Sequence, residues 1–282
     1  MPSVLSRLHR FATVAASLLG AVAGVASAGE DRSPPVSPER TDVSYNATLV
    51  APGAMQWEMG FDGAIPPVPS TRAALGMPTT FRVGLHRRVE LQPFDGDLLP
   101  WLARSEGPGR GVALAIKVRL NLPAAQSDVP RFVVRPYLQS TAMGAVFTGE
   151  APAIGAFVVM TQPLGRRANL DVNAGGHVDP NPHAEERTDL RGTASLSVEA
   201  TKWLRPYAEL YVRGDATAWR DGAFTADAGL VFAVHPTVAF DVAGRVDLLA
   251  RERAYAVLAG ATFVVQGPEP RHRAHAHAGR PR

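Results

Sequence analysis

The stretch MQWEMGFDG, residues 55–63, alternates large apolar side chains with polar or small ones. Met55, Trp57 and Phe61 fall on one face of an extended strand, and Gln56 and Glu58 fall on the other, because successive side chains of a strand point to opposite faces. In a soluble sheet the apolar face would contact a core. In a membrane barrel it would contact lipid.

The same alternation recurs along the chain in segments of about ten residues that are separated by turn chemistry, while a helical period is nowhere sustained. Such segments match the ~9 to 11 residues that a strand needs to cross a bilayer. The pattern predicts an all-β fold: a transmembrane antiparallel up-and-down β-barrel of about 12 strands. The further strands are expected at residues 79–86, 89–94, 112–122, 132–142, 154–162, 169–177, 190–200, 206–214, 224–234, 238–248 and 255–265.

The linkers between these segments alternate between long polar ones, such as residues 179–189, and tight turns, such as residues 86–88 and 235–237. Bacterial outer-membrane barrels have long loops outside and short turns on the periplasmic side. An even number of strands leaves both chain ends in the periplasm.

The side chains that share a face with Gln56 and Glu58 carry many charges, and a soluble core cannot be filled with charged side chains. We therefore expect lipid contact for Trp57, Met59 and Phe61, and a polar lumen inside the barrel. The candidate lumen residues are Glu58, Arg82, Glu90, Lys117, Arg119, Arg135, Asp171, Arg191, Glu199, Glu209, Arg213, Asp227, Asp241, Arg245 and Asp247.

These charges allow two interpretations of the lumen. Charges of opposite sign can pair across the barrel into a structural network that narrows the bore. Alternatively, a basic wall on the early strands can face an acidic wall on the late strands and orient small polar or zwitterionic solutes. The second interpretation sets Arg82, Arg119 and Arg135 against Asp227, Asp241 and Asp247.

The first 28 residues resemble a cleaved export signal. Arg7 and Arg10 precede an apolar run at residues 11–25, and residues 26–28, Ala-Ser-Ala, supply the small side chains that signal peptidase cuts. A membrane anchor is the alternative, but the run is shorter than the ~20 apolar residues of a spanning helix. We expect cleavage after Ala28 and localisation in the outer membrane.

The remaining chain divides into three parts. Residues 29–53 begin with a Pro-, Ser- and charge-rich stretch and are expected to form a periplasmic N-terminal lead-in. Residues 54–265 are expected to form the barrel, and residues 266–282 are expected to form a disordered, basic, His-rich tail. Much of the positive excess lies in that tail, so the near-neutral body gives no reason to expect nucleic-acid binding.

No catalytic residue, metal site or cofactor is expected. The chain has no cysteine, which excludes disulfides and thiolate metal sites. His272, His275 and His277 in the tail are close enough to share a metal ion, but they have no rigid scaffold. A lipid hydrolase would pair Ser195 or Ser197 with His86 or His177, but no nucleophile-elbow pattern is present.

Two blocks of sequence resemble a known family. The first, RTDVSYNATLVAPGAMQWEMGF at residues 40–61, contains Arg40, Asp42, Ser44, Thr48, Pro52, Gly53, Gln56 and Glu58, and the second is FRVGLHRRVELQ at residues 81–92. Together they resemble the outer-membrane family named for the meta-pathway of phenol degradation. That resemblance implies a transporter-like role in the envelope, with aromatic or hydrophobic solutes, and no catalytic residues. Gly260, Phe263 and Val265 resemble the C-terminal signal that barrel assembly machinery reads.

The expected function is a channel that passes small solutes across the outer membrane, with lipid, a small solute and the assembly machinery as partners. Long loops at residues 62–78 and 95–110 are available to gate it or to capture solute. Their apolar residues are candidates for an uptake patch: Ile65, Val68, Leu98, Leu99 and Trp101. The alternative is a non-transporting structural or adhesive barrel, and a lipid hydrolase comes third.

Overall fold

The computed structural model describes residues 38–39, 44–65, 74–98, 112–122, 128–140, 152–179, 188–216, 223–248 and 255–265. No helix in these ranges is long and apolar enough to cross a membrane. The strands are β1 (Met55–Ile65), β2 (Ala74–Gly76), β3 (Pro78–His86), β4 (Val89–Asp97), β5 (Val112–Arg119), β6 (Arg131–Ser140), β7 (Ala153–Leu164), β8 (Ala168–Val178), β9 (Thr188–Val198), β10 (Leu204–Asp215), β11 (Ala223–His235), β12 (Val238–Asp247) and β13 (Tyr255–Val265).

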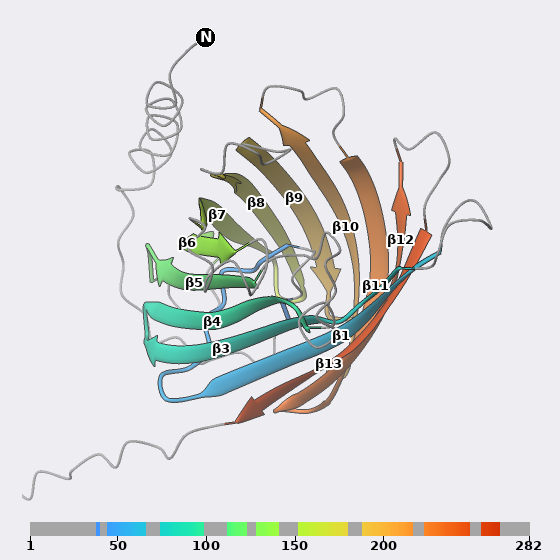
Figure 1. Cartoon of the computed structure of the whole chain (residues 1–282). Helices are drawn as coiled ribbons and strands as arrows, with labels where there is room; N and C mark the ends of the chain where they lie inside the picture. The colour runs from blue at the N-terminus through green and yellow to red at the C-terminus, as the bar shows by residue number, and fades with distance from the viewer. Residues whose placement is uncertain are drawn as a thin grey trace, which may run out of the picture.

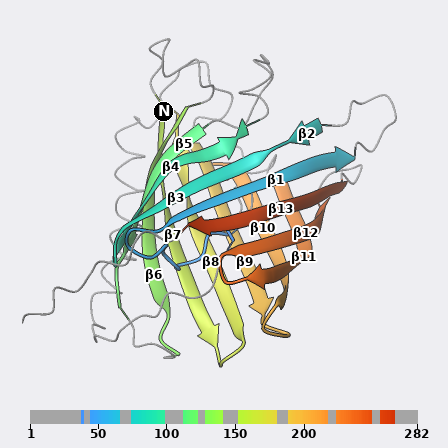
Figure 2. The same cartoon turned by 90° about the horizontal axis from the view of Figure 1, so that it is seen from below.

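The strands form one closed antiparallel barrel (Figures 1 and 2). Each strand pairs with its neighbours in chain order, and β13 pairs with β1 to close the sheet. β2 and β3 both pair with β1 in one register, since Gly76 lies opposite Asp62 and Thr79 lies opposite Met59. They act as one strand interrupted at Met77, so the barrel has twelve strands, and the predicted fold is confirmed.

The outer surface of the barrel is apolar and its interior is polar. On β1, Trp57 and Phe61 are 43% and 53% exposed, whereas Gln56 and Glu58 are 4% and 3% exposed. The same phase continues on other strands, with Leu114, Ile116, Leu196, Phe240 and Val242 exposed and Lys117, Arg119, Ser195 and Asp241 buried. An apolar band around a polar lumen is the arrangement of transmembrane β-barrels.

The two rims of the barrel differ. Tight turns join β3 to β4, β7 to β8 and β11 to β12 at the rim where β1 begins and β13 ends, which we call the turn end. The connections from β4 to β5, β6 to β7 and β8 to β9 lie at the opposite rim, the loop end. Most strand boundaries lie within a few residues of those expected, but residues 120–122 and 199–200 lie outside the strands.

Candidate functional site: the barrel lumen

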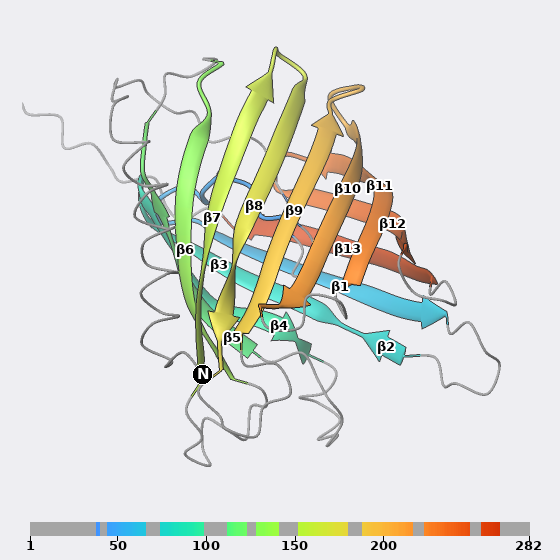
Figure 3. The ribbon, with the colours of Figure 1, turned by 90° about the horizontal axis from the view of Figure 1, so that it is seen from above.

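The described residues before β1 lie largely inside the barrel. We call these residues, 38–39 and 44–54, the N-terminal segment; Figures 1 and 3 show it as a blue trace within the ring of strands. Ala47 and Leu49 are buried in one apolar cluster, against Ala113, Ala115, Val133, Tyr137, Phe157 and Val159 of β5, β6 and β7. The expected periplasmic lead-in at residues 29–53 is therefore corrected for residues 38–39 and 44–50. The physical reason is that inward-facing apolar side chains of the barrel need an apolar partner.

The N-terminal segment enters β1 through a close backbone contact with β3. Gly53 has a positive φ of 79°, which glycine adopts without a steric penalty, and its amide donates to the carbonyl of Gly84 over 2.8 Å. The amide of Gly84 donates to the carbonyl of Ala54 over 3.0 Å. A Cβ atom on Gly84 would lie 2.0 Å from the carbonyl oxygen of Ala51, so only glycine fits there.

Glu39 of the N-terminal segment completes a buried cluster of charges on β1, β3, β4 and β5. The Arg82 guanidinium lies 2.8 Å from Glu90 and 3.3 Å from Glu58. The Lys117 ammonium lies 2.5 Å from Glu39, and both side chains are almost fully excluded from solvent. Buried charges are tolerated only when they are paired and hydrogen-bonded, and while the segment covers Lys117 its Glu39 supplies that partner.

Barrel side chains also bind the backbone of the N-terminal segment. The amide of Val50 donates to Glu90 over 2.8 Å, and the amide of Ala47 donates to the Thr161 hydroxyl over 2.8 Å. The carbonyl of Thr48 accepts from Arg82 over 2.9 Å. Buried backbone groups must find such partners when they join no sheet. Side chains from β3, β4 and β7 supply them here.

Arg135 on β6 joins the N-terminal segment to the early strands at a second place. Its guanidinium donates to Gln92 over 2.6 Å and also binds Asp95. It lies 4.2 Å from the ring centroid of Tyr45 and 5.3 Å from that of Tyr137, within cation–π range. Burial raises the pKa of the Tyr45 hydroxyl well above its ordinary value, and this hydroxyl donates to Asp95 over 3.2 Å.

Nearer the loop end, charges pair along the walls of the late strands. Asp189 is fully buried and accepts from Arg191 over 2.7 Å and from Arg213 over 3.1 Å. Arg245 on β12 lies 3.3 Å from Asp227 on β11. The first pair lies within β9, and the other two join neighbouring strands, so all three run along the wall.

The early-strand cations therefore do not form a bare basic wall. Arg82, Lys117 and Arg135 are each neutralised by carboxylates of the same wall or of the N-terminal segment. Arg119 is also buried, and it donates to the carbonyl of Ala47 over 3.3 Å. On this side of the lumen the structural network is the interpretation that the contacts support.

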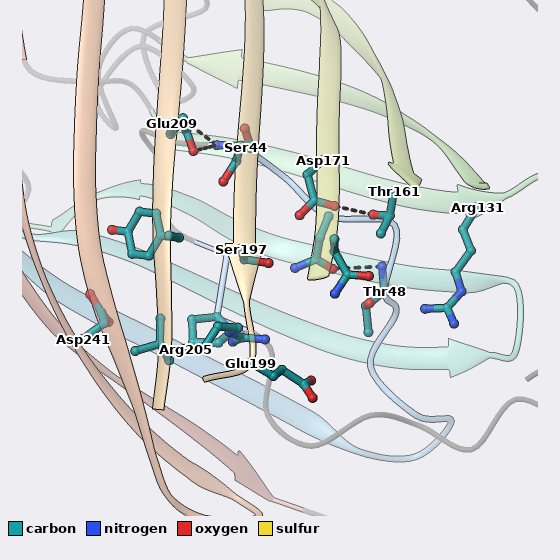
Figure 4. A pocket seen from close by; sticks show the side chains of 16 residues that line it. Ser44, Thr48, Arg131, Thr161, Asp171, Ser197, Glu199, Arg205, Glu209 and Asp241 are labelled. Carbon is teal, nitrogen blue, oxygen red and sulfur yellow. Dashed lines mark hydrogen bonds between the residues drawn. The ribbon is translucent and has the colours of Figure 1, made fainter. Parts of the chain in front are cut away.

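A cavity of about 160 Å³ remains between the N-terminal segment and the turn-end halves of β7 to β12 (Figure 4). Ser44, Asp171, Ser195, Arg205, Glu209 and Asp241 are among its lining residues. Figure 4 shows Glu209 bound to Ser44 of the N-terminal segment and Asp171 bound to Thr161. Most of the lining residues carry a charged or hydrogen-bonding group, so the space can hold water and polar solutes.

Two of the expected lumen carboxylates in this cavity form no ion pair with a described residue, although Arg205 lines the same cavity. In the part of the chain that the structure describes, no Lys or Arg nitrogen lies within 4.0 Å of Asp171 or Glu209. Asp241 also lines the cavity and is buried. Glu199, expected inside the strand at residues 190–200, instead follows the end of β9 and is exposed at the cavity rim. Asp247 is half-buried at the loop end of β12.

The candidate catalytic pairs are not brought together. His177 lies 3.2 Å from the Tyr137 hydroxyl and 3.8 Å from Asp189, near the loop end. Among the described residues, neither Ser195 nor Ser197 forms a hydrogen bond with a histidine, and no group of three metal-binding side chains occurs. The tail histidines and the signal segment lie outside the described residues.

Sequence reasoning missed the groups that organise the lumen: Glu39, Tyr45, Asp95 and Asp189. One signal was available. Ala113 and Ala115 share the inward face of β5 with Lys117, and these small apolar positions on a polar face indicate that something packs against them.

The sequence matches no protein-family profile and no curated protein. Among solved structures, the NanC porin has a TM-score of 0.52 at 8% identity, with 74% of this chain and 98% of that chain covered. The KdgM porin, solved in complex with disordered oligogalacturonate, has a TM-score of 0.51 at 7% identity, with 73% and 98% covered. At such identities the likeness concerns the fold alone: this chain has the fold of these porins.

Proposed function

We propose that this protein is an outer-membrane channel for small polar solutes, with a bore narrowed by its own N-terminal segment. The observation that carries the proposal is the polar cavity of about 160 Å³ that remains beside the segment within a closed barrel. A barrel filled only for structural purposes would need no such space.

The membrane location is supported by the outer surface. Leu114, Ile116, Phe240 and Val242 are exposed on the barrel exterior, and such a continuous apolar surface is costly in water but favourable in lipid. The export signal at residues 1–28 supplies the route, with cleavage after Ala28. Recovery of the protein in the outer-membrane fraction, with a mature chain that starts at Gly29, is the expected result. Recovery in the soluble periplasm without detergent would overturn it.

The lining of the cavity favours polar solutes over the aromatic or hydrophobic ones that the family resemblance implies. Carboxylates, hydroxyls and guanidinium groups line the space, and a polar solute can hydrogen-bond to them whereas an apolar solute cannot. The apolar residues proposed for aromatic uptake lie largely outside the described residues. The proposed role requires no catalysis and no cofactor.

A non-transporting barrel is the second candidate, and a specific observation favours it. The N-terminal segment binds β3, β4, β5 and β7 through buried ion pairs and hydrogen bonds, and it also binds β10 through Ser44, so it narrows the lumen. If the N-terminal segment never leaves the lumen, the bore can be closed to solutes. Such a protein would have a structural or adhesive role.

Planar-bilayer recording and liposome swelling with purified protein separate the two candidates. A channel is expected to conduct potassium chloride in small steps and to admit a pentose while it excludes a tetrasaccharide. A variant that lacks residues 38–50 is the informative partner, because it should conduct more than the wild type if the segment narrows an open bore. No conductance and no swelling for either protein, beside an active porin standard, would refute the channel.

A further inference from the structure

A row of side chains across the inner wall of β7 to β12 distinguishes the cavity from the rest of the lumen. Asp171 on β8 lies directly opposite Ser195 on β9, and Ser195 lies directly opposite Glu209 on β10. The row continues to Asp227 and Arg245, which pair with each other. Directly opposite residues have Cβ atoms about 4.5 to 5.5 Å apart, so two carboxylates flank one hydroxyl.

Both carboxylates keep free capacity for a ligand. Glu209 accepts two hydrogen bonds from the Ser44 amide, over 2.9 and 3.0 Å, and Asp171 accepts one from the Thr161 hydroxyl. A carboxylate has about four acceptor positions, so these bonds leave acceptors unused. Neither group has a Lys or Arg nitrogen within 4.0 Å among the described residues, in contrast to the paired carboxylates of the early strands.

Ser195 gives independent evidence of a site. Its side chain lines the cavity, the residue is only 7% exposed, and within the described chain no group hydrogen-bonds to its hydroxyl. This hydroxyl is open to the cavity and not engaged by the protein, so it is available to a ligand there. The hydroxyl can accept a hydrogen bond from a ligand located between the two carboxylates.

We propose that this row, Asp171, Ser195 and Glu209, is a binding site for a small organic cation with an ammonium group. The inference deepens the proposed function and rests on it, because it specifies the class of solute that the channel selects. An ammonium donates three hydrogen bonds, which suits two carboxylates and a hydroxyl.

The geometry favours an organic cation over a bare metal ion. Two carboxylates and one hydroxyl are fewer ligands than the roughly six to eight oxygens that Ca²⁺ takes, whereas an ammonium needs only three acceptors. The described residues contain no group of three metal-binding side chains. The cavity volume of about 160 Å³ is close to the ~150 Å³ that accommodates benzene, so the ligand has about six non-hydrogen atoms.

Butylammonium, butanol and butyrate form a matched set of probes, because they share a carbon chain of one length and differ in charge. Binding of each probe is measured by titration calorimetry and by saturation-transfer NMR on the full-length protein in detergent micelles. Butylammonium is expected to bind, and butanol and butyrate are expected to bind at least about tenfold more weakly, which is 1.4 kcal/mol. Equal binding of the three probes, or no binding of butylammonium, would overturn the proposal.

Two variants locate the site. Asp171→Asn combined with Glu209→Gln keeps the side-chain shapes and should weaken butylammonium binding by about tenfold or more, whereas Ser195→Ala should weaken it by about threefold. Asp215→Asn combined with Asp247→Asn removes the same charge from outside the cavity and should leave binding unchanged. If both double variants weaken binding equally, net charge is the cause and the site is refuted.

Two checks keep these results decisive. Electrophoresis of unheated samples establishes that each variant is a folded barrel. If the Asp171→Asn, Glu209→Gln double variant fails to fold, the result for Ser195→Ala decides the test. The binding test needs no transport. Selective binding without conductance would refute the channel and leave the site standing, while conductance without selective binding would refute the site.

Discussion

The contact between Lys117 and Glu39 yields the sharpest prediction about the N-terminal segment. The Lys117 ammonium is fully buried, 2.5 Å from Glu39 and 2.8 Å from the carbonyl of Asn46. Lys117→Met keeps most of the volume but leaves the Glu39 carboxylate without its nearest cation. Removal of one partner from a buried pair costs about 3 to 5 kcal/mol.

This cost destabilises the state in which the N-terminal segment is bound inside the barrel, because Glu39 is hydrated again when the segment leaves the lumen. At 1.4 kcal/mol per factor of ten, the equilibrium between the released and the bound N-terminal segment shifts toward release by roughly 100- to 4000-fold. Glu39→Gln should act in the same direction. The double variant should cost less than the sum of the two single variants, since the pair is then absent altogether.

Cysteine labelling measures this shift. The chain has no cysteine, so Leu49→Cys introduces a single thiol at a buried position of the N-terminal segment. Its reaction rate with a water-soluble thiol reagent should rise in the Lys117→Met background by the same factor as the equilibrium, and bilayer conductance should rise with it. Lys202→Met is the matched control, because Lys202 is the only other lysine and lies exposed in a turn.

An unchanged labelling rate in a folded Lys117→Met barrel would refute the reasoning. It would mean that the apolar contacts and the Arg135 site hold the segment without the ion pair. Faster labelling without any change in conductance would show that the segment does not limit the bore.

Three further predictions concern the barrel wall and the binding of the N-terminal segment inside the barrel. Val242→Arg places a charge on the exposed face of β12 and should lower the free energy of unfolding in lipid by about 2 to 4 kcal/mol. Ser197→Arg places the same charge in the cavity and should cost far less. Similar free energies for the two variants, measured by denaturant titration, would contradict the strand phase. Gly84→Ala should accelerate labelling of the segment because its Cβ would lie 2.0 Å from a backbone oxygen, while Gly244→Ala, whose Cβ meets nothing within 4 Å, should have no effect. Because burial raises the pKa of Tyr45, the unfolded chain loses the hydroxyl proton first as the pH rises, so the stability of the folded protein should fall above about pH 10. Tyr45→Phe should reduce this fall, which thermal melting at a series of pH values measures.

The barrel itself could be predicted from the sequence, because its determinants are local. The alternation at residues 55–63 defines which side chains of β1 face lipid, whatever the neighbouring strands are. Turn residues between the alternating segments define where each strand ends. Twelve such segments, each long enough for a bilayer, leave few architectures other than a closed barrel.

The contents of the lumen could not be predicted in the same way. Glu39 meets Lys117 across 78 positions of sequence, and Ser44 meets Glu209 across 165, so nothing local to either partner reveals the contact. The expectation of a periplasmic lead-in followed from its polar, Pro-rich start. Its later residues instead satisfy the inward-facing apolar positions of the barrel.

The row of Asp171, Ser195 and Glu209 depends on strand register, which the tertiary structure alone decides. Alternation places each of the three on the inner face, but a shift of two residues between β8, β9 and β10 would keep that face and separate the three side chains. Likewise, alternation identified the charges that point inward but not which of them pair. Pairing depends on distances across the closed barrel, and these left Asp171 and Glu209 without a Lys or Arg nitrogen within 4.0 Å in the part of the chain that the structure describes.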